Sequence, residues 1–146
     1  MPELILRQMT VLEAQRKALE AEGLLVEDLE GPDRRYFSAA NEEGHVVGYS
    51  GLEYCDEKNA LLRSVVVLPS FRSQGLGRKL VELMLAEVHP SADVYLVTTS
   101  AADFFESIGF ARISRDATPQ AILSTRQLSG LCPASATVMK LSKSQT

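Results

Sequence analysis

The chain has 146 residues, of which 45% are hydrophobic and 23% charged, and its formal net charge is −4. That length is enough for one domain with a proper core and too short for two ordinary ones, so we expect a single domain over residues 1–146. The acidic balance excludes nucleic acid and anionic membranes as expected partners, because both require a basic face.

No apolar run approaches the ~20 residues of a membrane span, and the N-terminal segment lacks the layout of a secretory signal. We therefore expect a cytoplasmic protein. Two isolated cysteines, Cys55 and Cys132, are too few for a disulfide framework, and His45 and His89 are far apart in sequence. No metal site is predicted, and each cysteine is expected to be a small buried residue.

The first half of the chain predicts a strand, helices and an antiparallel meander. A strand at 4–6 precedes a capping box of Thr10 and Glu13, which starts a helix that runs to about 22 and stops at Gly23. A short helix at 24–29 and a turn at 31–33 follow. Three strands at 36–40, 45–55 and 61–68 are then separated by turns at 41–44 and 56–59.

The run from Arg72 to Gly77 lies between the apolar strand and a helical pattern. Arginine, two spacers, glycine, spacer and glycine at such a junction form a bend whose main-chain N–H groups suit a pyrophosphate. Glycine lets the diphosphate approach the amides, and the following helix contributes its positive end. The alternative is that Gly75 and Gly77 only make a tight turn. The run has no third glycine at dinucleotide spacing and no Gly-Lys-Ser/Thr ending, so it matches neither of the common nucleotide-binding fingerprints.

The second half predicts further strands and helices around this unit. A stop at 89–90 is followed by a strand at 94–98, which must be parallel to the preceding strand because a helix separates them. A short helix at 101–107 ends at Gly109, and a strand follows at 110–114. Thr118 with Pro119 opens a helix to about 128, and the last strand is at 136–141.

Two segments together resemble the cofactor motifs of the GNAT superfamily of N-acetyltransferases. Residues 62–77 resemble its acetyl-coenzyme A motif, in which an Arg/Gln-x-x-Gly-x-Gly/Ala loop follows a strand ending in Val-x-Pro. Residues 101–110 resemble its second motif, a short helix ending in Gly-Phe. The resemblance implies an α/β fold with a mixed, mostly antiparallel sheet of six to seven strands, splayed at the cofactor site and flanked by helices.

The same resemblance implies acetyl-CoA as cosubstrate. Main-chain groups of Val65, Val66 and Val67 would pair with the pantetheine arm, although these residues alone would simply predict a buried strand. The main-chain N–H of Val66 or Val67 would hold the oxyanion. The pyrophosphate would be held by the loop and the start of the helix, that is by Arg72, Ser73, Gln74, Gly75, Leu76, Gly77 and Arg78.

The chain departs from the family at Phe105, where many members have the tyrosine that protonates the leaving thiolate. A tyrosine general acid at this position is excluded, and we expect Phe105 to pack on the cofactor while water or a nearby hydroxyl supplies the proton. Attack by a neutral amine requires a base, for which Glu53 is the candidate. The alternative for Glu53 is an ordinary exposed strand glutamate.

The second half resembles N-acetylglutamate synthase domains and the small amino-acid acetyltransferases found with arsenic-resistance genes. The run 132–136 favours the arsenic-resistance branch, because Ala134 stands where the glutamate enzymes have a carboxylate-binding arginine. Arg63 and Arg126 are candidate clamps for a substrate carboxylate, and Thr98 is a candidate substrate contact. Each arginine has a surface or ion-paired role as its alternative.

These observations predict an acetyl-CoA-dependent N-acetyltransferase that acts on a small amino acid or an amino-acid-like toxicant. Two alternatives stay open: a protein or peptide N-acetyltransferase, and a non-catalytic module that binds acetyl-CoA without turnover. Exposed strand edges in this architecture also allow a homodimer.

Overall fold

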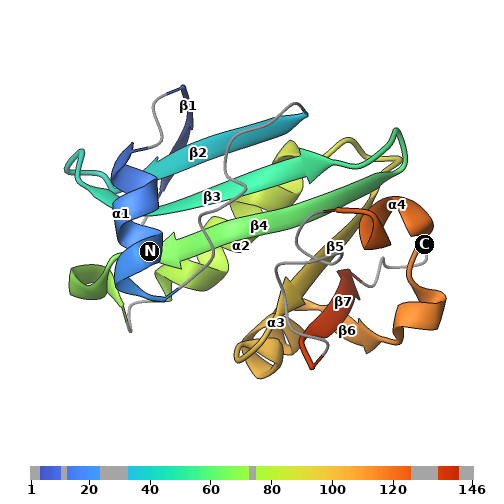
Figure 1. Cartoon of the computed structure of the whole chain (residues 1–146). Coiled ribbons are helices and arrows are strands. Elements are labelled where there is room, and N and C mark those ends of the chain that lie inside the picture. Colours follow the sequence, from blue (N-terminus) through green and yellow to red (C-terminus); the bar gives the residue numbers. More distant parts are fainter. Residues whose placement is uncertain (1–3, 11–12, 24–32, 73–74, 126–134, 142–146) are drawn as a thin grey trace. The chain divides into compact units, whose positions relative to one another are not determined.

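The computed structural model describes residues 4–10, 13–23, 33–72, 75–125 and 135–141. Strands within these ranges form a seven-stranded sheet in the order β1-β2-β3-β4-β5-β7-β6 (Figure 1). The β4 and β5 strands pair in parallel, whereas the pairs β1 with β2, β2 with β3, β5 with β7 and β6 with β7 are antiparallel. This confirms the mixed, mostly antiparallel sheet. The chain divides into two compact units, residues 1–53 with 62–89 and residues 54–61 with 90–146, which are described separately.

The first unit has a helix on each face of its strands. These strands are β1 (Ile5–Met9), β2 (Arg34–Ala40), most of β3 (Val46–Tyr54) and the part of β4 (Asn59–Val67) from Leu62 onward. Helix α1 (Glu13–Ala21) packs on one face, where Leu19 joins Tyr36, Tyr49 and Val66 in a buried cluster. Helix α2 (Leu76–Glu87) covers the other face (Figure 1). Leu80 of this helix approaches Gly48 on β3.

Two predicted turns connect the strands of the meander, and side chains stabilise both. The carboxamide oxygen of Asn41 accepts hydrogen bonds from the N–H groups of Glu43 and His45, at 3.0 Å each. Asp56 likewise accepts from the N–H groups of Lys58 and Asn59, at 2.8 and 2.9 Å. The hydrogen bond from Lys58 is the main cause that lowers the pKa of Asp56 below its ordinary value.

An irregularity interrupts β4 at Ser64. Ser64 has φ of 56°, a left-handed conformation that residues other than glycine seldom adopt inside a strand. On β3, Val47 and Cys55 are eight residues apart, whereas their hydrogen-bonded partners on the β4 side, Leu68 and Asn59, are nine residues apart. One extra residue on β4 therefore bulges out of the ladder, which bends the strand and strengthens its twist.

The second unit is built around β5 (Asp93–Thr98), which pairs with the first residues of β4 from Asn59 to Leu61. Its other elements are α3 (Ala102–Ile108), β6 (Phe110–Ile113), α4 (Gln120–Leu123) and β7 (Thr137–Leu141). Leu61, Tyr95, Ile122 and Val138 form its buried cluster. The parallel pairing of β4 with β5 confirms the expectation that a helical crossover joins them.

The predicted helix from Thr118 to about 128 is shorter in the structure. Thr118 does not cap it, because its hydroxyl donates to the carbonyl of Ser114 at 2.8 Å and Pro119 is the N-cap residue. The helix ends at Leu123, where the N–H and hydroxyl of Thr125 both donate to the carbonyl of Ile122. These local hydrogen bonds compete with continued helix. Residues 126–128 of the prediction, and the predicted helix at 24–29, lie outside the described ranges.

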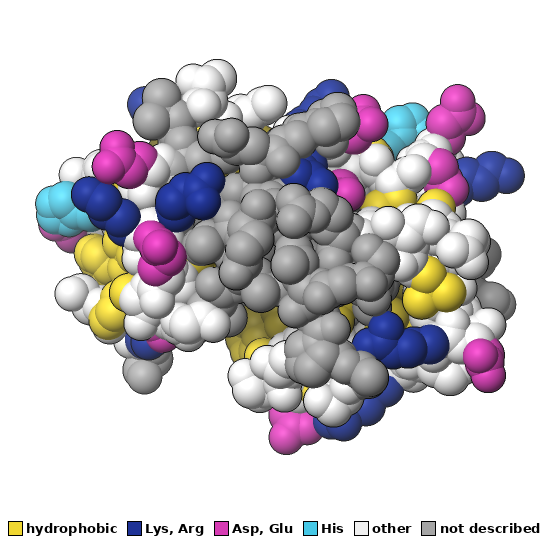
Figure 2. Space-filling model, viewed as in Figure 1, with side chains coloured by type: hydrophobic (Ala, Val, Ile, Leu, Met, Phe, Trp, Pro, Cys, Tyr) yellow, Lys and Arg dark blue, Asp and Glu magenta, His cyan; other side chains and the backbone are white. Residues whose placement is uncertain are grey.

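Charged side chains of both signs are intermixed among the described residues on the face shown in Figure 2. Within the described ranges, no helix combines the length and the apolar character that a bilayer crossing requires.

Candidate active site

The loop after β4 leads into the start of α2, where an anion site is predicted. Pro69–Phe71 forms one turn of 3₁₀ helix, and Gly75, with φ of 74°, is the N-cap residue of α2. The first bond within the helix runs from the N–H of Lys79 to the carbonyl of Gly75. The N–H groups of Leu76, Gly77 and Arg78 precede this bond, so they have no acceptor within the helix. They lie at the positive end of the helix dipole.

The side chains around this helix start have separate tasks. Leu76 is buried, with 3% of its surface exposed, and anchors the first turn in the core, whereas Arg78 is exposed and lies 3.8 Å from Glu82. An anion at this position would therefore meet main-chain N–H groups and the Arg78 guanidinium rather than the Leu76 side chain. Ser73 and Gln74 of the predicted phosphate loop lie outside the described residues.

Arg72 makes two contacts within the first unit. Its Nε donates to the carbonyl of Val67 at 3.0 Å, and its Nη2 lies 2.8 Å from a carboxylate oxygen of Glu22. The guanidinium thus connects the end of β4 to the end of α1. Its predicted role at a pyrophosphate stays a prediction, and that role requires the Glu22 contact to give way or to be shared.

The predicted pantetheine-binding strand is present and continuous with the bulge. Val66 is buried, and Val65 and Val67 are half-buried. The strand β3 approaches closely here, because a Cβ placed on Gly48 would lie 2.6 Å from the carbonyl oxygen of Val66. The main chain of this segment is therefore positioned by neighbouring elements.

The two residues predicted as base and clamp, Glu53 and Arg63, form one ion pair. Arg63 Nη1 lies 2.5 Å from Glu53 Oε1, and Arg34 Nε lies 3.5 Å from the same oxygen. The side chain of Arg63 is fully buried, whereas Glu53 keeps 13% of its side-chain exposure and Arg34 9%. Glu53 is therefore not an ordinary exposed strand glutamate. Sequence analysis missed Arg34, although Arg34 and Glu53 are direct partners in the register of β2 and β3.

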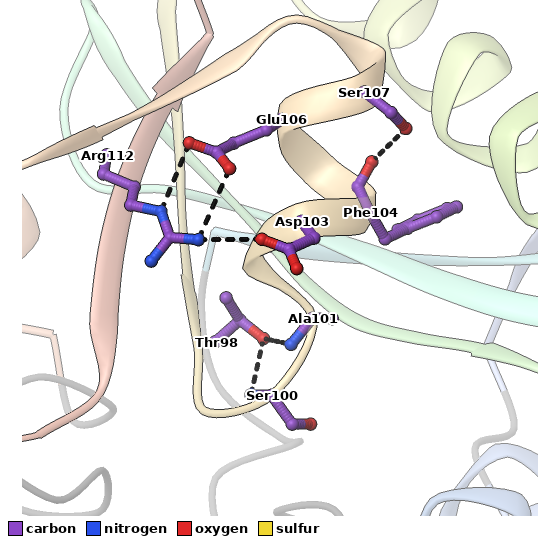
Figure 3. A network of polar contacts seen from close by, with 8 residues as sticks. All are labelled: Thr98, Ser100, Ala101, Asp103, Phe104, Glu106, Ser107 and Arg112. Carbon is purple, nitrogen blue, oxygen red and sulfur yellow. Dashed lines mark hydrogen bonds and ion pairs between the residues drawn. The ribbon is translucent and has the colours of Figure 1, made fainter.

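In the second unit, Thr98 organises the approach to α3. Its hydroxyl oxygen accepts hydrogen bonds from the N–H groups of Ser100 and Ala101, at 3.4 and 3.0 Å (Figure 3). This oxygen therefore stabilises the turn between β5 and α3. The substrate contact predicted for Thr98 stays a prediction, and Arg126 lies outside the described residues.

Phe105 lies on α3 in a small aromatic cluster. Its ring makes edge-to-face contacts with Phe104 and Phe110, with centroids 5.1 and 5.8 Å apart, and 9% of the residue is exposed. Because the side chain carries no proton donor, Phe105 can contribute only packing.

An exposed ion network ties α3 to β6. Arg112 on β6 contacts Glu106 at 3.2 Å and Asp103 at 2.9 Å (Figure 3). The hydrogen bond with Glu106 is the main cause that raises the pKa of Arg112 above its ordinary value. The network lies at the surface, so we assign it an orienting role for α3 rather than a large share of stability.

Comparison with known proteins places this geometry in a family. Residues 32–112, more than half of the chain, match the model of the acetyltransferase (GNAT) domain. An uncharacterized N-acetyltransferase of Chlorobaculum tepidum is 33% identical over 90 residues, which cover 60% of this chain and 57% of that protein. The matched segment thus spans little more than half the length of this relative.

Solved structures have the same fold at low identity. The N-acetylglutamate synthase from Neisseria gonorrhoeae, complexed with coenzyme A and N-acetyl-glutamate, superposes with a TM-score of 0.74 at 15% identity, over 95% of this chain and 35% of that one. A spermidine N-acetyltransferase from Vibrio cholerae gives a TM-score of 0.69 at 13% identity, over 94% and 92%. Acetyl-CoA is the acetyl donor of GNAT acetyltransferase domains, and the chain belongs to this family.

Proposed function

We propose that the protein transfers the acetyl group of acetyl-CoA to the amine of a small amino acid or an amino-acid-like toxicant. The observation that carries the choice of acceptor is the ion pair of Glu53 and Arg63, flanked by Arg34. In the structure Glu53 and Arg63 are paired with each other and the Arg63 side chain is fully buried, so binding of a substrate requires this pair to open or to be shared. A zwitterionic amino acid offers the complementary ammonium and carboxylate, and a guanidinium binds a carboxylate bidentately.

The donor would be held by main-chain groups of the first unit. We propose that Val65, Val66 and Val67 pair with the pantetheine arm and that the N–H groups of Leu76, Gly77 and Arg78 bind the pyrophosphate. Gly75, with its positive φ, supports this role because it ends the loop directly before these donors. Arg72, Ser73 and Gln74 complete the proposed loop, and Phe105 is proposed to pack on the cofactor.

The reaction would proceed by direct attack. Glu53 accepts a proton from the substrate ammonium, directly or through water, and the neutral nitrogen attacks the thioester carbonyl. A main-chain N–H of Val66 or Val67 stabilises the oxyanion of the tetrahedral intermediate. Its collapse would break the C–S bond and release the coenzyme A thiolate, and the nitrogen would lose its second proton to water to leave the neutral amide. Water or a nearby hydroxyl then protonates the thiolate, because Phe105 has no proton to give.

We further propose that the protein belongs to the branch found with arsenic-resistance genes, is cytoplasmic, and forms one domain over residues 1–146. The branch assignment rests on Ala134, which stands where the glutamate enzymes place a carboxylate-binding arginine. Thr98 and Arg126 remain proposed substrate contacts, and a homodimer remains a proposal.

Transfer from isotope-labelled acetyl-CoA tests the acceptor class. We expect small amino acids to be labelled. The matched amides and decarboxylated amines, which lack the carboxylate, should be labelled far less. Labelling confined to peptides or aminoglycosides would exclude the proposal. Peptide labelling would instead favour a protein N-acetyltransferase.

Thiol release separates an enzyme from a non-catalytic binder. We expect steady release of coenzyme A that depends on the amine and is lost in Glu53→Gln, which keeps the size of the side chain and a hydrogen-bond acceptor for Arg63. Binding of coenzyme A without amine-dependent release would identify a binding module.

A further inference from the structure

Gln15 is a polar residue buried on the core-facing side of α1. It is 0% exposed, and Leu19 is the other buried residue of that helix. Residues on an inward face one turn apart are normally apolar. A buried carboxamide costs free energy unless its hydrogen bonds are made. The hydrogen bonds of Gln15 therefore indicate its role.

The carboxamide of Gln15 binds two main-chain carbonyls on different strands. Its Nε2 donates to the carbonyl of Ser64 on β4 at 3.2 Å and to the carbonyl of Ser50 on β3 at 3.4 Å. Both partners are acceptors, so the nitrogen rather than the oxygen of the carboxamide must face them. The Oε1 atom of Gln15 is buried without a hydrogen-bond partner among the described residues. The side chain therefore uses only its donor half.

The acceptor on β4 is the residue that forms the bulge. Ser64 holds φ of 56° without glycine's freedom, and such a conformation persists only where the surroundings determine it. The hydrogen bond from Gln15 reaches this carbonyl directly, across 49 residues of sequence. The next residues along β4 are Val65, Val66 and Val67, so the orientation of the peptide at Ser64 sets where their main-chain groups point.

We propose that Gln15 is a positioning residue that fixes the β4 bulge through its two donated hydrogen bonds and so aligns the main chain of Val65–Val67 for the cofactor. The functional half of this inference rests on the proposed acetyl-CoA site. The structural half, that Gln15 holds Ser64 in place, stands on the geometry of the protein without ligand.

Amide hydrogen exchange tests the structural half on the full chain without coenzyme A. In Gln15→Leu we expect the peptide over residues 62–68 to exchange about tenfold faster, the change that corresponds to roughly one hydrogen bond. Val81→Ala is the control, because Val81 is a buried residue of α2 and its truncation lowers stability without removing the hydrogen bond between Gln15 and Ser64. Unchanged exchange in Gln15→Leu, or the same acceleration in Val81→Ala, would overturn the inference.

Kinetics test the functional half. We expect the KM for acetyl-CoA to rise about tenfold in Gln15→Leu and to stay unchanged in Val81→Ala. Gln15→Met should resemble Gln15→Leu, because the methionine side chain is close to glutamine in length and has no hydrogen-bond donor. Adding Ser64→Gly to Gln15→Leu should restore part of the affinity, since glycine adopts a positive φ without help.

The outcomes separate the two proposals. A wild-type affinity for acetyl-CoA in Gln15→Leu or in Gln15→Met would overturn the positioning role. A wild-type protein that binds no coenzyme A, together with accelerated exchange in Gln15→Leu, would instead refute the proposed function and leave the structural role of Gln15 in place.

Discussion

Gly48→Ala should weaken both the fold and the cofactor site by pushing β3 away from β4. A Cβ on Gly48 would lie 2.6 Å from the carbonyl oxygen of Val66, 3.3 Å from Leu80 Cδ2 and 3.4 Å from the Cα of Val67. The φ of Gly48 is not positive, so the added methyl group acts only through these contacts. Two of the three are to main chain and cannot be relieved by a rotamer change.

The expected size follows from the overlap. Non-bonded heavy atoms prefer separations of about 3.5–4.0 Å, so the strands must part by about 1 Å at this point. Overpacking of this kind costs about 1–3 kcal/mol of unfolding free energy. For a domain of this size, each kcal/mol lowers Tm by about 2–4 °C. Because the displaced segment includes Val66 and Val67, affinity for coenzyme A should fall as well.

Urea denaturation and calorimetric titration with coenzyme A measure the two effects. Ser50→Ala is a matched control on the same strand, since Ser50 is fully buried and its hydroxyl has no hydrogen-bond partner among the described residues. Its loss leaves no group unsatisfied, so stability should not fall. If Gly48→Ala unfolds at the wild-type urea concentration and binds coenzyme A normally, the close approach of β3 to β4 is not as described.

Three other predictions concern different parts of the chain. Gly75→Ala has room for its methyl group but must hold φ of 74°. Denaturation should therefore show that the unfolding free energy falls by about 1–2 kcal/mol, and titration should show a weaker affinity for coenzyme A. Unchanged values in both measurements would contradict the left-handed conformation at this N-cap. Glu53→Leu alone leaves the Arg63 guanidinium without its closest carboxylate and should lower the unfolding free energy, measured in urea, by about 3–5 kcal/mol. The double variant Glu53→Leu with Arg63→Met should lose less stability, and equal losses would argue against a buried pair. Burial is the main cause that raises the pKa of Tyr95 above its ordinary 10.0. The contribution of Tyr95 to folding stability is therefore complete below pH 10 and is lost as pH rises through the raised pKa. Tyr95→Phe should flatten the fall in stability measured above pH 10, and an unchanged slope would contradict the raised pKa.

Local signals account for what the sequence predicts correctly. The turns at 41–44 and 56–59, which asparagine and aspartate stabilise, predict two hairpins. Two consecutive hairpins place β2, β3 and β4 side by side in that order. The stop at Gly109 and the helical crossover between β4 and β5 follow from glycine chemistry and chain connectivity in the same way. At the site, Gly75 is predicted from the Arg-x-x-Gly-x-Gly pattern between strand and helix, and its φ of 74° is one that glycine adopts readily.

Contacts that depend on register or on distant elements were not predictable from local pattern. The end of α4 depends on Thr125, whose hydroxyl and N–H both donate to the carbonyl of Ile122 and so compete with continued helix in a way that composition does not reveal. Glu53 and Arg63 were selected separately for two roles, yet the hairpin brings them together. Beyond Ser64, the one-residue bulge changes which β4 side chain faces a given residue of β3, and the alternation of the sequence does not reveal that change.

The main chain of β4 shows why its own sequence says little about its function. Three successive features of this strand are specified from elsewhere: α1 provides the donor to the Ser64 carbonyl, β3 the close approach to the Val66 carbonyl, and the loop residue Arg72 the donor to the Val67 carbonyl. Val66 is buried and Val65 and Val67 are half-buried, so these side chains pack the strand against its neighbours. If this main chain binds the cofactor, then selection for binding acts on a glutamine, a glycine and an arginine that the strand does not contain, and a search for functional residues confined to the strand would miss them.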